Sequence, residues 1–206
     1  MKNSNSKLLR AALAMALGAS LSAALPANAE STTVNGNGAL STNARIDFSV
    51  VIPRFLSFRV GTTGVTIDQI TFSPTAATVG NSTPISGTGG DAGAGTAANV
   101  SVLGNGGQIT ISEANNSAGA GLKHATLADT ISYTEITTSS SDGNLPAPAL
   151  SNAGGNTSTP VLNGASSVTN RTAVWTYAYA NTTIPSAGTY GTSAKGGRVT
   201  YTASMP

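Results

Sequence analysis

The chain of 206 residues has no cysteine, only one histidine, and just 9% charged residues. Without cysteine it has no disulfide, no thiolate nucleophile and no thiolate zinc site. With His124 as its only histidine, a site built from several histidines is excluded. A Ser–His–acid triad would have to use His124, which lies in a polar segment predicted to be a loop. The fold must therefore be stabilised by side-chain burial and backbone pairing.

The acidic residues do not form an evident catalytic pair. Seven carboxylates stand singly along the chain: Asp47, Asp68, Asp91, Glu113, Asp129, Glu135 and Asp142. Asp142-Gly143-Asn144 offers oxygen atoms of the kind that calcium binds, but it is also an ordinary turn, and the rest of an EF-hand loop is absent. We therefore predict a non-enzymatic protein with no catalytic, cofactor-binding or metal-binding residues, and with no cofactor.

The first 29 residues are predicted to be a Sec signal peptide that is removed. Lys2, Lys7 and Arg10 accompany an apolar run from Leu8 to Leu25, and Ala27-Asn28-Ala29 fits a cleavage site. A membrane-spanning helix is the alternative, although small and polar residues interrupt the run. No second apolar stretch of spanning length follows. We expect export to the cell surface, the medium or the periplasm, with no transmembrane segment after cleavage.

Removing the predicted signal peptide changes the charge balance. The ten basic residues fall to seven while all eight acidic residues remain, so the net charge becomes about −1. Affinity for nucleic acids rests largely on clusters of Lys and Arg. We therefore expect no nucleic-acid partner.

Short runs of alternating apolar residues predict β-strands along the rest of the chain. The predicted ranges are 44–52, 54–60, 65–72, 98–103, 108–113 and 131–136, with a short edge strand over 159–162. The first two ranges fit either one long strand with a bulge at Pro53 or two strands at a corner of the sandwich. The sequence Gly-Asn-Gly-Gly at 104–107 favours a hairpin between 98–103 and 108–113. Residues 73–96 and 137–158 are rich in Gly, Ser and Thr and are predicted as long loops, the first of which has room for a short edge strand.

The last 34 residues, Ala173–Pro206, hold the only Trp and four of the five Tyr. They form two alternating runs, which we predict to pair as a hairpin. One face of the first run carries Trp175, Tyr177 and Tyr179, and one face of the second carries Val199, Tyr201, Ala203 and Met205. The aromatic row is favoured as part of the core, and a ligand-binding platform is the alternative.

These patterns predict an all-β protein. The expected fold is a single immunoglobulin-like or pilin-like antiparallel β-sandwich of about 7–10 strands with long Gly/Ser/Thr-rich loops. The expected organisation is a signal peptide over 1–29, a flexible extension over 30–43 and the sandwich over 44–206.

The carboxy-terminal pattern resembles that of a known class of protein. An aromatic strand, the turn Pro185–Tyr190 and the final strand Val199–Ala203 resemble the ends of bacterial secreted β-sandwich subunits of the fimbrial, pilin-like or spore-coat-like kind. In such families a strand from a neighbour completes the sandwich, which is a form of β-augmentation. The resemblance implies structural roles for Tyr190, Val199 and Tyr201 near the final strand, and self-assembly or assembly with homologous subunits.

Two sets of residues are candidates for strand-mediated assembly. Segment 30–43 lacks the alternating large apolar residues that a donated strand needs, whereas 44–52 has them. The candidate assembly residues are Ile46, Phe48, Val50, Ile52, Val199, Tyr201 and Ala203. The first four fit an ordinary first strand equally well. The expected function is an exported structural or adhesive surface subunit, and the alternative is a monomeric secreted or periplasmic binding module, for example for glycans.

Overall fold

The computed structural model describes residues 32–93 and 95–206, so the predicted signal peptide lies outside the described residues. The chain divides into two compact units, Met1–Ile52 and Pro53–Pro206. In the described part of the first unit, no residue belongs to a helix or a strand. The strand predicted over 44–52 is therefore absent. Alternation marks a sequence that is able to form a strand, but a strand exists only where a neighbouring backbone pairs with it.

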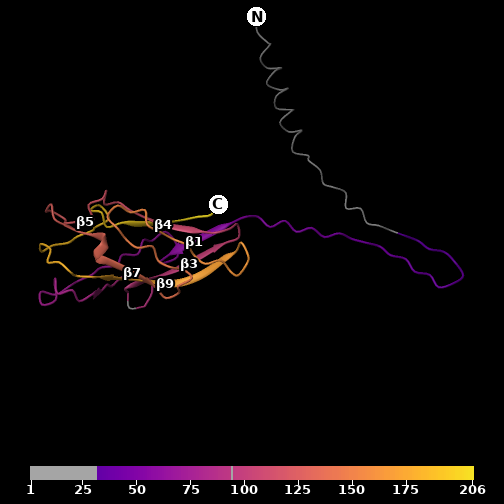
Figure 1. Ribbon diagram of the computed structural model, residues 1–206, viewed down its shortest axis with the longest axis horizontal. Helices are drawn as coiled ribbons and strands as arrows, with labels where there is room; N and C mark the ends of the chain where they lie inside the picture. The colour runs from indigo at the N-terminus through magenta and orange to yellow at the C-terminus, as the bar shows by residue number, and fades with distance from the viewer. Residues whose placement is uncertain (1–31, 94) are drawn as a thin grey trace, which may run out of the picture. The chain divides into compact units, whose positions relative to one another are not determined.

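The second unit is all-β, as predicted (Figure 1). Its strands pair antiparallel throughout. Among the described residues the helical content is one 3₁₀ turn, η1 (Tyr133–Glu135). Backbone pairing between strands therefore organises this unit.

The larger sheet is built around its longest strand, β9 (Thr169–Tyr179). On one side of β9 lies β3 (Ala97–Gly104), and β1 (Leu56–Val60) lies beyond β3. The carboxy-terminal end of β9 also pairs with β2 (Ile85–Ser86) and with β7 (Ile136–Ser140). β2 lies within 73–96, the range predicted as a loop with room for a short edge strand.

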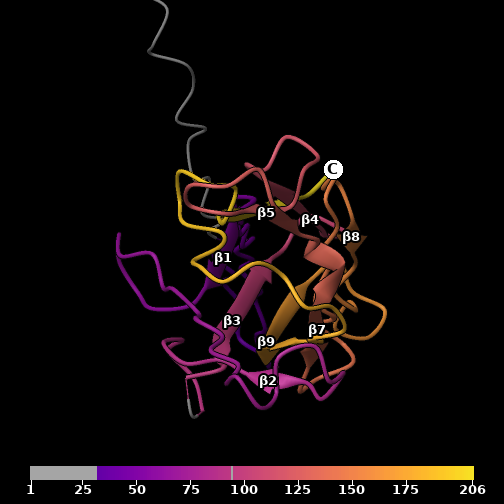
Figure 2. The ribbon, with the colours of Figure 1, turned by 90° about the vertical axis from the view of Figure 1, so that its left-hand side faces the viewer.

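The smaller sheets complete the second unit. In the three-stranded sheet, β4 (Thr110–Asn115) lies between β10 (Val199–Ser204) and β8 (Thr157–Ser158). A separate pair joins β5 (Leu122–Lys123) to β6 (Thr130–Ile131). In Figure 2, β3, β9 and β7 lie beside one another, and β4 and β8 lie above them.

One hydrophobic core receives side chains from both the five-stranded sheet and the three-stranded sheet. Trp175 of β9 is fully buried, and its indole N–H donates to the carbonyl oxygen of Leu145 at 3.0 Å. Its ring meets the ring of Tyr201 of β10 edge-on, with the ring centres 5.2 Å apart. Leu145 and Leu150 are buried although they lie in the range 137–158, which was predicted as a loop.

Both predicted hairpins are wrong. β3 and β4 follow one another but belong to different sheets, and so do β9 and β10. A turn signal fixes the local bend and not the partner of each strand. The aromatic faces of β9 and β10 are instead buried against each other across the core, where the hydroxyls of Tyr177 and Tyr201 lie 3.1 Å apart.

Three other predicted strands differ from the structure. Residues 65–72 contain only an isolated bridge between Thr71 and Thr88. In the same segment the Asp68 carboxylate accepts the backbone N–H of Thr62 at 2.6 Å and closes a local loop. The range 131–136 is interrupted by η1, whose first turn is capped by the Ser132 hydroxyl. Residues 159–162 form no strand, and β8 lies just before them.

Candidate functional site

Segment 44–52 exposes a row of large apolar side chains. Ile46, Phe48, Val50 and Ile52 stand at alternate positions and are 70%, 87%, 83% and 73% exposed. Val51, on the opposite parity, is 90% exposed. Single exposed apolar side chains are common on proteins, but a contiguous apolar group more often marks an interaction site. An extended chain with one apolar face is the form that a strand takes when it adds to a sheet.

The five-stranded sheet ends at β1 and the three-stranded sheet ends at β10, and each of these strands has an outer edge with unpaired backbone N–H and C=O groups. Among the described strands, β1 pairs only with β3, and β10 pairs only with β4. The N–H of Gly61 donates to the carbonyl of Asn99. Because residues of a strand direct their backbone groups alternately toward and away from the partner strand, this bond shows which residues of β1 face β3. It follows that the backbone groups of Leu56, Phe58 and Val60 point away from β3.

The same alternation applies to β10. Glu113 lies opposite Tyr201, and its backbone N–H donates to the carbonyl of Asn156 on the far side of β4. Glu113 and Tyr201 are therefore a non-hydrogen-bonded pair, in which both residues direct their backbone N–H and C=O groups away from each other. The backbone groups of Val199, Tyr201 and Ala203 therefore point away from β4. A free strand edge of this kind is a template for another strand.

The free edges of β1 and β10 lie next to each other. The two strands are in contact, and the side chains of Leu56 and Met205 both approach Gly104. Apolar side chains along this edge are only partly buried although they pack against the core: Phe58, Val60, Val199, Tyr201, Ala203 and Met205. We name this feature the β1–β10 edge. It includes three residues that the sequence singled out, namely Val199, Tyr201 and Ala203.

The aromatic row of β9 lies inside the protein. Trp175, Tyr177 and Tyr179 are 0%, 8% and 4% exposed. Burial raises the pKa of the Tyr177 hydroxyl above its ordinary value, as it does for Tyr179. A ligand platform made from these three side chains is therefore not available on the surface.

His124 is a structural residue in this fold. It is buried, and its Nδ1 accepts the backbone N–H groups of Thr126 and Leu127 at 3.0 and 2.8 Å. Nδ1 must therefore be unprotonated, so Nε2 carries the proton and donates to the carbonyl of Ala187 at 3.1 Å. A Cβ at Gly188 would lie 1.9 Å from Nε2, which requires glycine there. Both nitrogens are occupied, so the ring is not a free base.

Tyr190 and Asp129 join the loops around His124. The Tyr190 ring meets the His124 ring edge-on, with centres 4.9 Å apart. Its hydroxyl donates to the Asp129 carboxylate at 2.8 Å, and the N–H of Ser186 donates to the same carboxylate at 3.0 Å. Hydrogen bonds from Ser186 and then from Tyr190 lower the pKa of Asp129 to about 2. This arrangement gives Tyr190 a structural role.

Glu113 is a buried carboxylate that the sequence pattern did not reveal. It is 1% exposed, and its side-chain oxygens accept no hydrogen bond from the described residues. Burial raises the pKa of the Glu113 carboxyl above its ordinary value, and the polar groups of Asn156, Asn115 and Ser151 offset this only in part. The signal that identifies it is its alternate spacing with Ile109 and Ile111, which places all three side chains on the inward face.

Replacement of Glu113 by Gln should alter how stability depends on pH. A raised pKa in the folded state means that the folded protein holds this proton more tightly than the unfolded chain does. The free energy of unfolding should therefore fall as pH rises from the ordinary value of 4.5 through the raised pKa. Glu113→Gln should remove that fall. Urea unfolding at a series of pH values measures it, with the exposed Asp47→Asn as the control. Parallel curves for wild type and Glu113→Gln would contradict the prediction.

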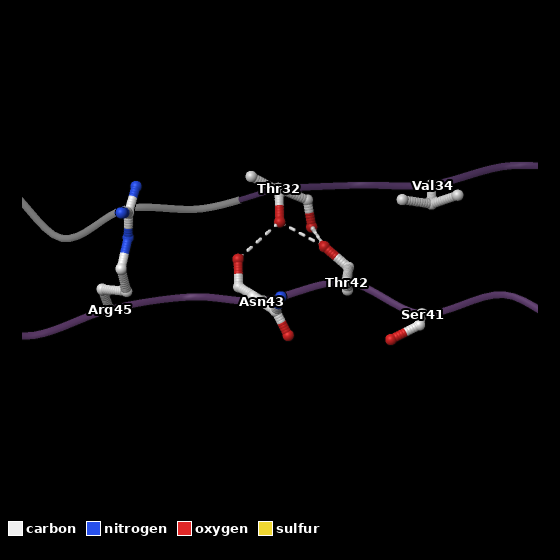
Figure 3. Close-up of a pocket in the computed structure, with 6 residues that line it drawn as sticks. All are labelled: Thr32, Val34, Ser41, Thr42, Asn43 and Arg45. Carbon is white, nitrogen blue, oxygen red and sulfur yellow. Dashed lines mark hydrogen bonds between the residues drawn. The ribbon is translucent and has the colours of Figure 1, made fainter.

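A pocket in the described part of the first unit is lined mainly by polar residues (Figure 3). The Thr32 hydroxyl hydrogen-bonds to the Thr42 hydroxyl and donates to the carbonyl of Asn43 at 2.8 Å. Val34, Ser41 and Arg45 complete the lining. The lining has no carboxylate and no histidine, so it offers no acid–base pair. Over residues 32–93 and 95–206, no cluster of three or more potential metal ligands of the His, Cys, Asp and Glu types occurs.

Comparison with known proteins gives no relative from which a function can be transferred. No protein-family model matches the chain, and neither a curated protein nor a solved structure matches it. Within the described part of the chain, none of the helical segments has the length and apolar character required to cross a bilayer. The exposed apolar segment 44–52 and the β1–β10 edge are therefore the features on which a functional argument can be built.

Proposed function

We propose that this chain is an exported, non-enzymatic structural or adhesive surface subunit that assembles by donation of a β-strand. The observation that carries the proposal is the exposed apolar row Ile46, Phe48, Val50 and Ile52, which belongs to no sheet. Such a row is costly in water. Burying one of these side chains contributes about 1.5–3 kcal/mol.

Other features support the same role. The predicted signal peptide accounts for export, and a β-sandwich supplies strand edges on which subunits can be joined. The resemblance of the carboxy-terminal segment to fimbrial and spore-coat-like subunits gives the same class. The one histidine has both ring nitrogens occupied, so the side chain that most often serves as a catalytic base is not free for chemistry.

The proposal is tested by the mass in solution of residues 30–206 recovered from the periplasm. Size exclusion with light scattering should give a series of multimers, because the donated strand of each copy is held by the next. These multimers should resist SDS at room temperature and dissociate on heating, since no disulfide holds them. A discrete folded monomer at all concentrations would overturn the proposal and would favour a monomeric binding module.

A further inference from the structure

We propose that segment 44–52 of one copy docks on the β1–β10 edge of a second copy, and that residues 53–55 prevent it from docking on its own. The segment would pair with the free backbone groups of β10 and turn its apolar row toward the core. This inference rests on the proposed function, because it names the acceptor surface of the same assembly.

The spacing of side chains on donor and acceptor agrees. Ile46, Phe48, Val50 and Ile52 occupy alternate positions, and so do Val199, Tyr201, Ala203 and Met205 of the acceptor. Neighbouring strands direct the side chains of one parity to the same face of a sheet. A segment paired with β10 would therefore place its four apolar side chains beside the four partly buried ones. Its polar positions Asp47 and Ser49 would then lie on the same face as Thr200 and Thr202.

The edges of β7 and β8 suit this segment less well. β7 offers mainly hydroxyl side chains, and two of them bond to the neighbouring loop: Thr138 donates to the carbonyl of Pro148, and Ser140 to that of Leu145. β8 consists only of Thr157 and Ser158. An apolar row set against these strands would meet polar neighbours. Neither β7 nor β8 carries a partly buried apolar side chain that packs on the core, whereas a series of such side chains borders the β1–β10 edge.

Residues 53–55 are fixed beside the turn that joins β3 to β4. The N–H of Phe55 donates to the Asn105 side-chain oxygen at 2.9 Å, and the Asn105 amide donates to the carbonyl of Pro53 at 2.8 Å. The Arg54 guanidinium donates to the carbonyl of Gly106 at 3.3 Å. We name these three contacts the Asn105 clamp. They continue the register of β1 against β3, in which Leu56 lies opposite Gly104.

The Asn105 clamp decides which molecule receives the strand. Leu56, at the start of β1, and Met205, at the end of β10, both lie beside Gly104. A segment that precedes β1 must therefore reverse its direction to run along either strand of its own body. A reversal in so few residues needs a tight turn at 53–55, whereas the clamp holds these residues as an extension of β1. The segment remains available to a second copy.

Disulfide trapping tests the proposal, because the chain has no cysteine of its own. The full chain would carry Ser49→Cys together with Thr200→Cys or with Thr202→Cys, both exposed on the polar face of β10. The matched controls are Ser49→Cys with Thr137→Cys on β7 and with Thr157→Cys on β8, which are also exposed threonines. Multimers would be oxidised mildly and heated in SDS with and without a thiol.

The expected result is a ladder that survives heating, collapses with thiol, and appears with Thr200→Cys or Thr202→Cys but not with the controls. A ladder from Thr137→Cys or Thr157→Cys, or SDS-resistant multimers without any cross-link, would overturn the assignment of the edge while leaving the proposed function intact. A cross-link confined to the monomer band would show that the clamp does not prevent insertion into the same molecule. Loss of multimers from the wild-type chain itself would overturn the proposed function, and this inference with it.

Discussion

Phe48→Asp should abolish the SDS-resistant multimers and leave a folded monomer. Phe48 is the largest side chain in the exposed row, and burying it contributes about 1.5–3 kcal/mol. Since 1.4 kcal/mol corresponds to a factor of ten, its loss alone weakens docking about 10- to 100-fold. An unpaired carboxylate in the same place adds a desolvation cost, so the total effect should be larger. Light scattering at matched concentration and SDS gels without heating measure the result.

The matched control is Ser49→Asp, which adds the same charge one position away on the opposite face of the segment. It should retain the multimers, because Ser49 would remain at the surface of the augmented sheet. Both variants should unfold at wild-type temperatures when diluted to monomers, since neither residue packs in the core. Equal loss of assembly in the two variants would show that added charge, and not the apolar face, is responsible.

Trp175→Ala should have the largest effect on the stability of the second unit. Its side chain fills the centre of the core between β9 and β10, and removing a buried Trp typically costs about 3–5 kcal/mol. This is a large part of the roughly 5–15 kcal/mol by which a domain is stable. Urea unfolding followed by circular dichroism measures the change, best in the Phe48→Asp background so that assembly does not contribute.

Trp175→Phe separates packing from the indole hydrogen bond. The carbonyl of Leu145 also accepts the Ser140 hydroxyl at 2.7 Å, so it keeps a partner when the indole N–H is lost. The cost should therefore be well below that of Trp175→Ala. Thr172→Ala, exposed on the same strand, should change little. A Trp175→Ala variant as stable as Thr172→Ala would contradict the central position of this side chain in the core.

The sequence predicted the kind of structure and several of its strands. Alternation located β1, β3, β4, β9 and β10 to within a few residues, because a strand buried on one face leaves a period-two pattern. It also identified the face of β9 that carries Trp175, Tyr177 and Tyr179. These features are local properties of the chain, which is why one sequence is enough to reveal them.

Local sequence patterns did not predict which strands pair with each other. Gly-Asn-Gly-Gly at 104–107 is a strong hairpin signal, yet Asn105 and Gly106 instead bind residues 53–55, which lie 50 to 52 residues away in the sequence. The candidate site could likewise be predicted only in part from the sequence. The apolar row of 44–52 is evident in the sequence, but whether it pairs within the chain depends on long-range contacts. The β1 part of the acceptor edge follows only from the pairing of the strands, whereas the alternation of Glu113 with Ile109 and Ile111 is a local sign of its burial.

The order of the strands has a consequence for how the chain reaches its native state. Among the described residues, β5 and β6 are the only consecutive strands that pair with each other. Gly104 must find Thr169, and Thr110 must find Ser204, before either large sheet exists. Proteins dominated by such distant pairings fold slowly, because the loop-closure entropy is lost before the contacts form. During that interval both the β10 strand and segment 44–52 are exposed together in every copy. Premature association is therefore a hazard of the same surfaces that would join finished subunits, and folding and assembly compete for one set of residues.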